Sequence, residues 1–202
     1  MHRRVFDSLI AFTGFALAVV LLVAGALLTW AHVFVKDQVR SQLVSEKIFF
    51  PAAGTAALTT DPEIKKYVTP YAGQQVVNGE QAEVFADHYI AVHLRGIGGG
   101  KTYSELSAQS LADPTDTKLA ATVQTMFRGE TLRGLLLNAY AFGRMATIAL
   151  YAAIAAYIGA ALLLVLSALG FWHARKVGGV ALVTSTPDGT PSVAAADSTG
   201  VA

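Results

Sequence analysis

The sequence predicts an all-α membrane protein with two antiparallel transmembrane helices and an intervening helical extracytoplasmic domain. Two long stretches without Asp, Glu, Lys or Arg predict the transmembrane helices: residues 9–30 and residues 145–172. Each stretch exceeds the roughly 20 residues that an α-helix needs to cross about 30 Å of hydrocarbon. Only 14% of the chain is charged, whereas soluble domains contain about 25% charged residues. Between the stretches apolar residues follow helical spacing, and no segment alternates as a strand does.

Basic residues at the ends of the two stretches predict which side of the membrane each end faces. Arg3 and Arg4 precede the first stretch. Arg175 and Lys176 follow the second. Basic residues next to a membrane span favour the cytoplasmic side. The basic residues that border the connection between the two stretches carry less weight for the orientation, because that connection is longer than about 60 residues. The expected division is a cytoplasmic N-terminus (1–8), a first transmembrane helix (9–30), an extracytoplasmic helical domain (31–143), a second transmembrane helix (144–172) and a disordered cytoplasmic tail (173–202).

The first apolar stretch is also similar to a secretory signal peptide. Basic residues precede it, and Ala24-Gly25-Ala26 has the small residues of a cleavage site. The apolar core of a signal peptide is about 7 to 15 residues long, however, and this stretch continues to Trp30. An uncleaved signal anchor in the cell membrane is therefore the preferred interpretation.

Small residues recur four apart inside both apolar stretches. They are Gly14 and Ala18 in the first stretch, and Ala152, Ala156 and Ala160 in the second. This spacing lets helix backbones approach closely in lipid, so it predicts packing between the two helices or against a partner. The alternative is that alanine is simply abundant in this chain. Because neither stretch carries an ionisable group, no ion path or proton relay is expected.

The region between the stretches begins as a series of helices. The first helix is expected to continue beyond the membrane through residues 33–47, where apolar side chains form one stripe. Asp61 is expected to cap a short helix that starts at Pro62. Residues 79–95 form an amphipathic helix. Its buried side is expected to consist of Ala82, Phe85, Ala86, Tyr89, Ile90 and Leu94.

The later part of the chain predicts two further helices and a tail. Asp113 is expected to cap a helix that begins at Pro114. Residues 127–144 keep helical spacing and are expected to run directly into the second apolar stretch. The final residues 178–202 are small and polar, contain Pro and Gly, and have no period, so they are expected to be disordered.

The stretch GIGGGKTYSE, residues 96–105, contains the glycines and the Lys-Thr pair of a phosphate-binding loop. In this stretch Gly100-Lys101-Thr102 would form the end of the P-loop motif. The motif also needs a glycine five positions before Gly100, and Arg95 stands at that position. The preceding segment is also helical, not a strand. Thr102 and Glu105 instead have the spacing of a capping box, with the glycines forming the turn before it. No nucleotide site is expected.

A metal site is the other chemistry that the residue types suggest. His88 and His93 are five positions apart, so they diverge by about 140° on an α-helix and do not share a face as i, i+4 ligands do. The carboxylates Glu80, Glu83 and Asp87 fit a solvated acidic stripe. The chain has no cysteine, which excludes disulfides and thiolate ligands. No metal, cofactor or nucleotide is expected.

No catalytic residue is assigned from the sequence. None of the serines stands in a G-x-S-x-G nucleophile elbow. The formal net charge of +1 gives no strong field for nucleic acid. The lipid bilayer and a membrane or envelope protein are the expected partners.

Three segments carry a resemblance to a known family: KIFFPAAG, GGKTYSELSAQSL and FRGETLRGLLLNAY. In these the chain resembles a family of uncharacterised two-span membrane proteins of high-GC Gram-positive (actinobacterial) bacteria. The resemblance covers roughly residues 5–176 and leaves out the tail. It implies the two-span topology and carries no established activity.

The functional hypothesis that follows is a non-enzymatic scaffold or accessory protein. Its external helical domain is expected to bind a partner in the cell envelope through Ile48, Phe49 and Phe50, although docking of these side chains on the domain's own core is the simpler alternative. A second hypothesis is an extracytoplasmic sensor of a small ligand or cation that uses Glu80, Glu83 and Asp87. A third, less favoured, is a metal-dependent enzyme.

Overall fold

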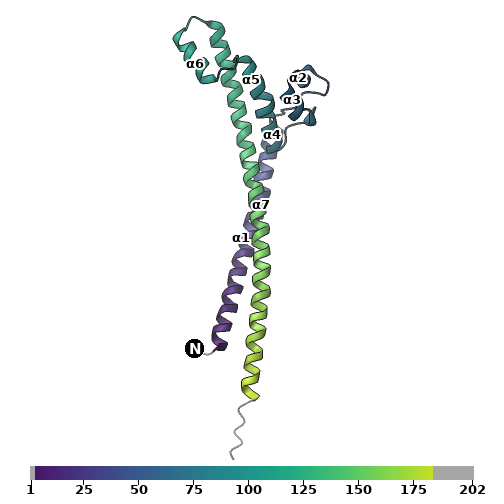
Figure 1. Cartoon of the computed structure of the whole chain (residues 1–202), viewed down its shortest axis with the longest axis vertical. Coiled ribbons are helices and arrows are strands. Elements are labelled where there is room, and N and C mark those ends of the chain that lie inside the picture. The colour runs from purple at the N-terminus through teal and green to yellow at the C-terminus, as the bar shows by residue number, and fades with distance from the viewer. Residues whose placement is uncertain (1–2, 184–202) are drawn as a thin grey trace, which may run out of the picture. The chain divides into compact units, whose positions relative to one another are not determined.

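The computed structural model describes residues 3–183, which form helices joined by turns (Figure 1). In chain order they are α1 (Arg3–Ser45), α2 (Ala56–Thr59), α3 (Pro62–Tyr67), the 3₁₀ turn η1 (Thr69–Tyr71), α4 (Gly79–Phe85), the π-helical turn η2 (Ala86–Ile90), α5 (Ala91–Ile97), α6 (Tyr103–Ala112) and α7 (Thr117–Val183). Within this part of the chain no strand forms, and an isolated bridge joins Phe49 to Gln75.

Helices α1 and α7 are the two long elements, with 43 and 67 residues. Both are long and apolar enough to cross a membrane. The expected continuation of the first helix is confirmed as far as Ser45, and residues 127–144 continue into the second apolar stretch within α7. The predicted all-helical fold with two long apolar helices is confirmed.

The chain divides into two compact units. Residues 1–22 and 158–202 form one, called here the apolar unit, and residues 23–157 form the other, called the helical module.

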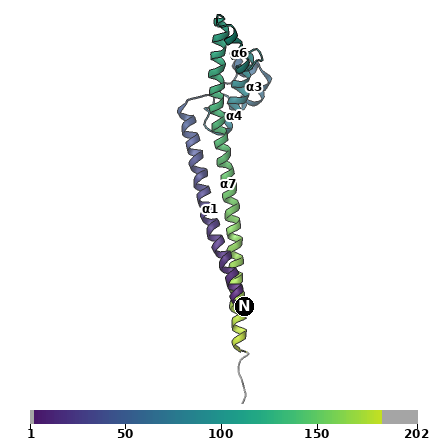
Figure 2. The ribbon, with the colours of Figure 1, turned by 90° about the vertical axis from the view of Figure 1, so that its left-hand side faces the viewer.

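The helical module has its own hydrophobic core. Figure 2 shows α3, α4 and α6 on one side of the α7 segment that belongs to the module. Phe50 lies inside this core, where its ring stacks on Tyr71 at 5.2 Å and meets the edge of Phe85 at 5.3 Å. The buried core residues are Val39, Leu43, Phe50, Leu58, Ile64, Val68, Val76, Ala82, Phe85, Ala86, Ile90, Leu94, Leu106, Met126 and Leu136.

The amphipathic helix expected over residues 79–95 forms as α4, η2 and α5 in direct succession. Its predicted buried side is confirmed except for Tyr89, which is half-buried. The π-helical turn in the middle was not predicted. Such turns are rare and often occur at functional sites, and this one carries Asp87 and His88.

The predicted helix start at Asp61 is confirmed. Its carboxylate Oδ1 accepts hydrogen bonds from the backbone N–H groups of Glu63 at 2.8 Å and Ile64 at 3.3 Å, and Pro62 occupies the first position of α3. These bonds satisfy donors that the first turn of a helix leaves without a partner.

Replacing this cap is expected to destabilise the helical module modestly. Asp61→Ala should lower its free energy of unfolding by about 1 kcal/mol, whereas Asp61→Asn should retain most of it because asparagine caps about as well. Urea unfolding of the full chain in detergent micelles, followed by circular dichroism, measures both. An equal loss in the two variants would contradict the capping role.

The predicted helix start at Asp113 and Pro114 is wrong. Asp113 ends α6, and its Oδ1 accepts hydrogen bonds from the backbone N–H and the hydroxyl of Thr115. Helix α7 begins at Thr117, with Asp116 Oδ1 accepting from the N–H of Leu119 at 2.9 Å. The reason is local competition: the Asp113 side chain closes a turn with Thr115 and is not free to cap a helix.

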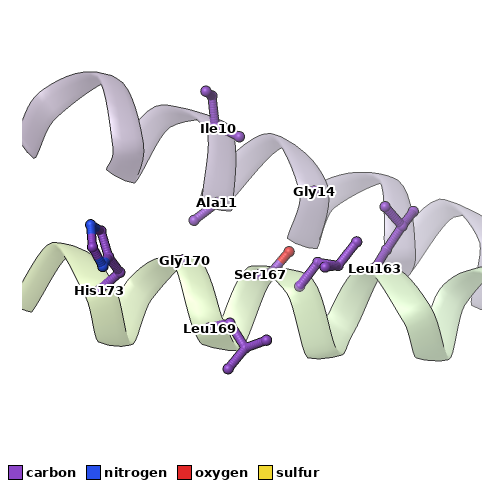
Figure 3. Close-up of a pocket in the computed structure, with 9 residues that line it drawn as sticks. Ile10, Ala11, Gly14, Leu163, Ser167, Leu169, Gly170 and His173 are labelled. Carbon is purple, nitrogen blue, oxygen red and sulfur yellow. The ribbon is translucent and has the colours of Figure 1, made fainter. Parts of the chain in front are cut away.

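In the apolar unit α1 and α7 meet through small residues (Figure 3). The figure shows the Ser167 hydroxyl pointing toward the turn of α1 that holds Gly14. A Cβ added at Gly14 would lie 2.6 Å from Ser167 Oγ, and one added at Gly170 would lie 3.1 Å from the Cβ of Ala11. Among the described residues Ser167 Oγ is buried without a hydrogen-bond partner. Close backbone approach through small residues is the packing mode expected in lipid.

The buried small residues are spaced seven apart and not four. In α1 they are Ala11, Ala18 and Gly25, and in α7 they are Ala146, Ala153, Ala160 and Ser167. Of the stripe predicted in the second stretch, only Ala160 lies on this buried face, since Ala152 is exposed and Ala156 is half-buried. Seven residues come close to two turns of an α-helix, so residues spaced seven apart lie on one face of it.

The disorder expected from residue 173 onward is wrong for residues 173–183. Helix α7 continues to Val183, so residues 178–183 are helical. The sequence of this last part of the helix contains Val180, Leu182 and Val183 after Gly178 and Gly179. Residues 184–202 lie outside the described part of the chain.

Candidate functional site

A cluster of charged side chains lies in the helical module where α3, η2, α5 and α7 meet. Its members are Glu63, Asp87, His88, Arg95, Glu130 and Arg133. A cavity of about 370 Å³ opens beside them, and Gly100, Lys101 and Thr102 of the glycine-rich turn also line it. The cluster combines a histidine, three carboxylates and two guanidinium groups, so it is the candidate site with the most varied chemistry in the described residues.

Glu63 is the acceptor for one half of the cluster. Its Oε1 lies 3.0 Å from His88 Nδ1, and its Oε2 lies 2.5 Å from Arg95 Nη2. The hydrogen bond from His88, followed by the one from Arg95, holds the pKa of Glu63 below its usual value. The His88 ring also stacks on Tyr67, with centroids 3.9 Å apart. These contacts fix the imidazole, with Nδ1–H donating to the carboxylate.

Arg133 organises the other half of the cluster. Its Nε and Nη2 donate to Asp87 Oδ1 at 3.0 Å and 2.8 Å, and its Nη1 donates to Glu130 Oε2 at 3.3 Å. The hydrogen bond to Asp87 is the main cause that raises the pKa of Arg133. The π-helical turn brings Asp87 toward α7 on one side and His88 toward α3 on the other. The cluster thereby joins both elements to η2.

The arrangement neutralises its own charges. Each carboxylate of the cluster accepts a hydrogen bond from a basic side chain of the cluster. A histidine oriented by a carboxylate is also the geometry of a general base, but that chemistry needs a nucleophile within reach of the imidazole. No hydrogen bond from a Ser, Thr or Tyr hydroxyl to His88 occurs in the part of the chain that the structure describes. The ion pairs tie α3 to η2 and α5, and η2 to α7.

The pH dependence of stability should report the Glu63 interactions. Because its pKa is lowered in the folded chain, Glu63 stabilises the module fully above the unfolded-state pKa of about 4.3 and loses that contribution as the pH falls through the folded-state pKa. Glu63→Gln should therefore lower the melting temperature at pH 7, with a difference from the native chain that narrows toward pH 3. Parallel curves for the two chains would contradict this role; Glu46→Gln, at an exposed position, is the control.

The structure separates the residues considered as metal ligands. His88 Nδ1 contacts Glu63, whereas His93 Nδ1 lies 2.7 Å from the carbonyl oxygen of Tyr89. Among residues 3–183 no group of three His, Asp or Glu side chains is placed to hold a metal ion. Asp87 is bound by Arg133, so the acidic stripe that the sensor hypothesis needs is reduced to Glu80 and Glu83.

The predicted capping box in the glycine-rich stretch is confirmed. Thr102 Oγ1 accepts from the N–H of Glu105 at 3.3 Å, and Glu105 Oε2 accepts from the N–H of Thr102 at 2.7 Å. Gly99 and Gly100 adopt positive φ angles of 58° and 81° in the preceding turn, a conformation that glycine adopts without strain. Lys101 Nζ donates to Gln109 Oε1 at 2.8 Å. The turn serves as the start of α6.

The three residues predicted to contact a partner point in alternating directions. Phe50 is 2% exposed and belongs to the core, and Ile48 packs against the core. For Ile48 and Phe50 the structure thus shows the simpler alternative, docking on the domain's own core, and the Phe50 ring is enclosed by Tyr71 and Phe85. Phe49 is 56% exposed. Of the three, Phe49 presents its ring at the surface.

Backbone pairing holds Phe49 outward. The N–H of Phe50 donates to the carbonyl of Gln74, and the N–H of Val76 donates to the carbonyl of Ile48, both at 2.9 Å. In such extended pairing successive side chains point to opposite sides. Ile48 and Phe50 therefore enter the core while Phe49 faces away from it.

Sequence reasoning missed the pairing of Glu63 with His88 and Arg95. The partners lie 25 and 32 positions apart in the chain, so no local spacing marks them. The π-helical turn that orients His88 also has no signal in the residue pattern.

Comparison with family models, with curated proteins and with solved structures finds no match to this chain. The resemblance to two-span actinobacterial membrane proteins thus stays a prediction.

Proposed function

We propose that the chain is a membrane-anchored scaffold or accessory protein. Helices α1 and α7 cross the cell membrane as an antiparallel pair, and residues 31–143 of the helical module lie on the outer side and bind a protein of the cell envelope. The composition of the two helices supports the anchoring. In the apolar unit large side chains such as Phe12, Leu17 and Leu162 are exposed while small residues are buried. This inverts the pattern of a water-soluble helix pair and suits contact with lipid chains.

The distribution of basic residues supports the orientation. Two pairs of basic residues border the apolar stretches on the sides nearer the chain termini: Arg3 and Arg4 before the first stretch, and Arg175 and Lys176 after the second. Such residues favour the cytoplasmic face, so both termini are placed there. The connection of residues 31–143 then lies outside.

The exposure of the Phe49 ring is the observation that supports the proposed binding role. A large aromatic side chain held outward on a fixed backbone loses little conformational entropy on binding, which is why aromatic residues dominate binding hot spots. The charged cluster, in contrast, is satisfied by its own members. The module therefore offers a contact surface rather than a reaction centre.

Site-specific photocrosslinking tests this function in the native cell. A benzophenone amino acid at position 49 is expected to give a protein adduct, and the same group at Gln109, an exposed position of α6, is not. Phe49→Ala should abolish co-purification of the captured protein in mild detergent while leaving the circular dichroism spectrum unchanged. Adducts of equal yield at both positions, or none at position 49, would contradict the proposal.

A further inference from the structure

A groove of about 560 Å³ lies in the helical module between α1, the start of α4 and α7. Two glycines shape it: a Cβ on Gly79 would lie 3.0 Å from the carbonyl oxygen of Ala139, and a Cβ on Gly143 would lie 3.4 Å from the Cα of Gly79. The backbones of α4 and α7 are thus in contact at its floor. Its charged lining residues are Lys36, Asp37, Arg40, Glu80 and Arg144.

The charges of this groove are not neutralised from within. Three cations face two carboxylates, and all five side chains belong to exposed residues. None of these five residues forms an ion pair with a nitrogen–oxygen distance within 4.0 Å in the described part of the chain. The charged cluster of the candidate site is paired throughout, so the two places differ in kind. An excess of unpaired cations in a groove attracts an anion.

The cations also mark the ends of the apolar stretches. Lys36 is the first charged residue after the first stretch, and Arg144 is the last before the second. Trp30 and Phe34, six and two residues before Lys36, are both exposed and stack at 5.4 Å. Tryptophan favours the boundary between hydrocarbon and headgroups. Given the membrane anchoring proposed above, on which this step rests, the groove lies at the level of the lipid phosphates.

We propose that this groove binds the phosphate of an anionic lipid headgroup through Lys36, Arg40 and Arg144. Guanidinium groups form paired hydrogen bonds with phosphate oxygens, and lysine adds a point charge. A zwitterionic headgroup has no net charge and therefore gains less than an anionic one from the excess of positive charge in the groove. A free phosphate shares the recognised chemistry, but the neighbouring aromatic pair and apolar helices favour a ligand that has acyl chains.

Quenching of Trp30 fluorescence by brominated lipids tests the proposal. The chain has two tryptophans, so Trp172→Phe leaves Trp30, about 9 Å along α1 from Lys36, as the single reporter. This chain is placed in phosphatidylcholine vesicles that contain a minor fraction of brominated phosphatidylglycerol or, in the second arm, brominated phosphatidylcholine. The anionic lipid is expected to quench Trp30 more strongly. Each of Lys36→Gln, Arg40→Gln and Arg144→Gln should weaken this preference by about fivefold.

A matched control removes the same charge elsewhere. Lys65→Gln, Lys66→Gln and Arg128→Gln together change three exposed residues that do not line the groove, and the preference should survive. Arg144→Lys keeps the positive charge and should retain part of the preference for the anionic lipid. This variant therefore distinguishes an effect of lost charge from an effect of misfolding. Equal quenching by the two lipids, or equal loss in the control, would overturn the proposal.

Two further arms separate the remaining outcomes. If inorganic phosphate added to the vesicles removes the preference at millimolar concentration, the groove recognises free phosphate and the lipid proposal is overturned. Carbonate extraction of the vesicles shows whether the chain is inserted. If the chain stays in the membrane but shows no lipid preference, only the proposal for the groove is refuted. If carbonate releases the chain, the proposed membrane anchoring is itself refuted.

Discussion

Phe50→Ala is expected to lower the free energy of unfolding of the helical module by about 3 to 5 kcal/mol. Phe50 is 2% exposed, stacks on Tyr71 and meets the edge of Phe85. Truncation removes its transfer free energy and leaves a cavity between two aromatic rings, of which Tyr71 belongs to η1 and Phe85 to α4. A loss of this size is a large share of the stability of a small domain. Urea unfolding of the full chain in micelles measures it.

The neighbouring Phe49 provides the matched control. Phe49→Ala removes the same atoms from a ring that is 56% exposed, so stability should change by no more than about 0.5 kcal/mol. The two variants together test the alternation that places Phe50 in the core and Phe49 outside. A large loss for Phe49→Ala, or a negligible one for Phe50→Ala, would show that the segment is paired in the opposite register.

Ala160→Leu is expected to separate the two helices of the apolar unit. Ala160 is 0% exposed on the seam of α7, while its neighbour Ala161 is exposed. A leucine side chain at position 160 has no space there, and overpacking of this kind costs about 1 to 3 kcal/mol. Ala161→Leu adds the same atoms on the exposed side and should leave the helix contact unchanged.

Oxidation of an introduced cysteine pair measures this separation in the membrane. A Cβ at Gly14 would lie 3.9 Å from the Cβ of Ser167, which is within the range of about 3.5 to 4.5 Å for disulfides. Gly14→Cys with Ser167→Cys is therefore expected to cross-link in a chain that has no other cysteine. Addition of Ala160→Leu should reduce the yield strongly. An unchanged yield, or an equal reduction by Ala161→Leu, would contradict the seam.

Much of the fold followed from the residue pattern because its signals are local. The uncharged stretches, the cap at Asp61 and the capping box at Thr102 each depend on residues within a few positions, and each was found. Asp113 failed as a cap because two local structures compete for one carboxylate, and its turn with Thr115 prevailed. The seven-residue seam was missed because the frequent alanines of α7 also fit a four-residue spacing.

The sites were predicted less well because they join distant parts of the chain. Glu63 meets His88 and Arg95 only after α3 has packed on the π-helical turn. The cations of the groove come from α1 and α7, more than 100 positions apart, as in Lys36 and Arg144. Charge and spacing in one sequence do not reveal such pairs; packing brings them together.

Labelling of single cysteines in intact cells tests the central claim most directly. The natural chain has no cysteine, so every signal comes from the introduced residue. With a membrane-impermeant maleimide, Gln109→Cys in the helical module is expected to react in intact cells, whereas Thr199→Cys near the C-terminus should react only after the cells are permeabilised. Reaction of Thr199→Cys from outside, with Gln109→Cys protected, would place the module in the cytoplasm and contradict the account.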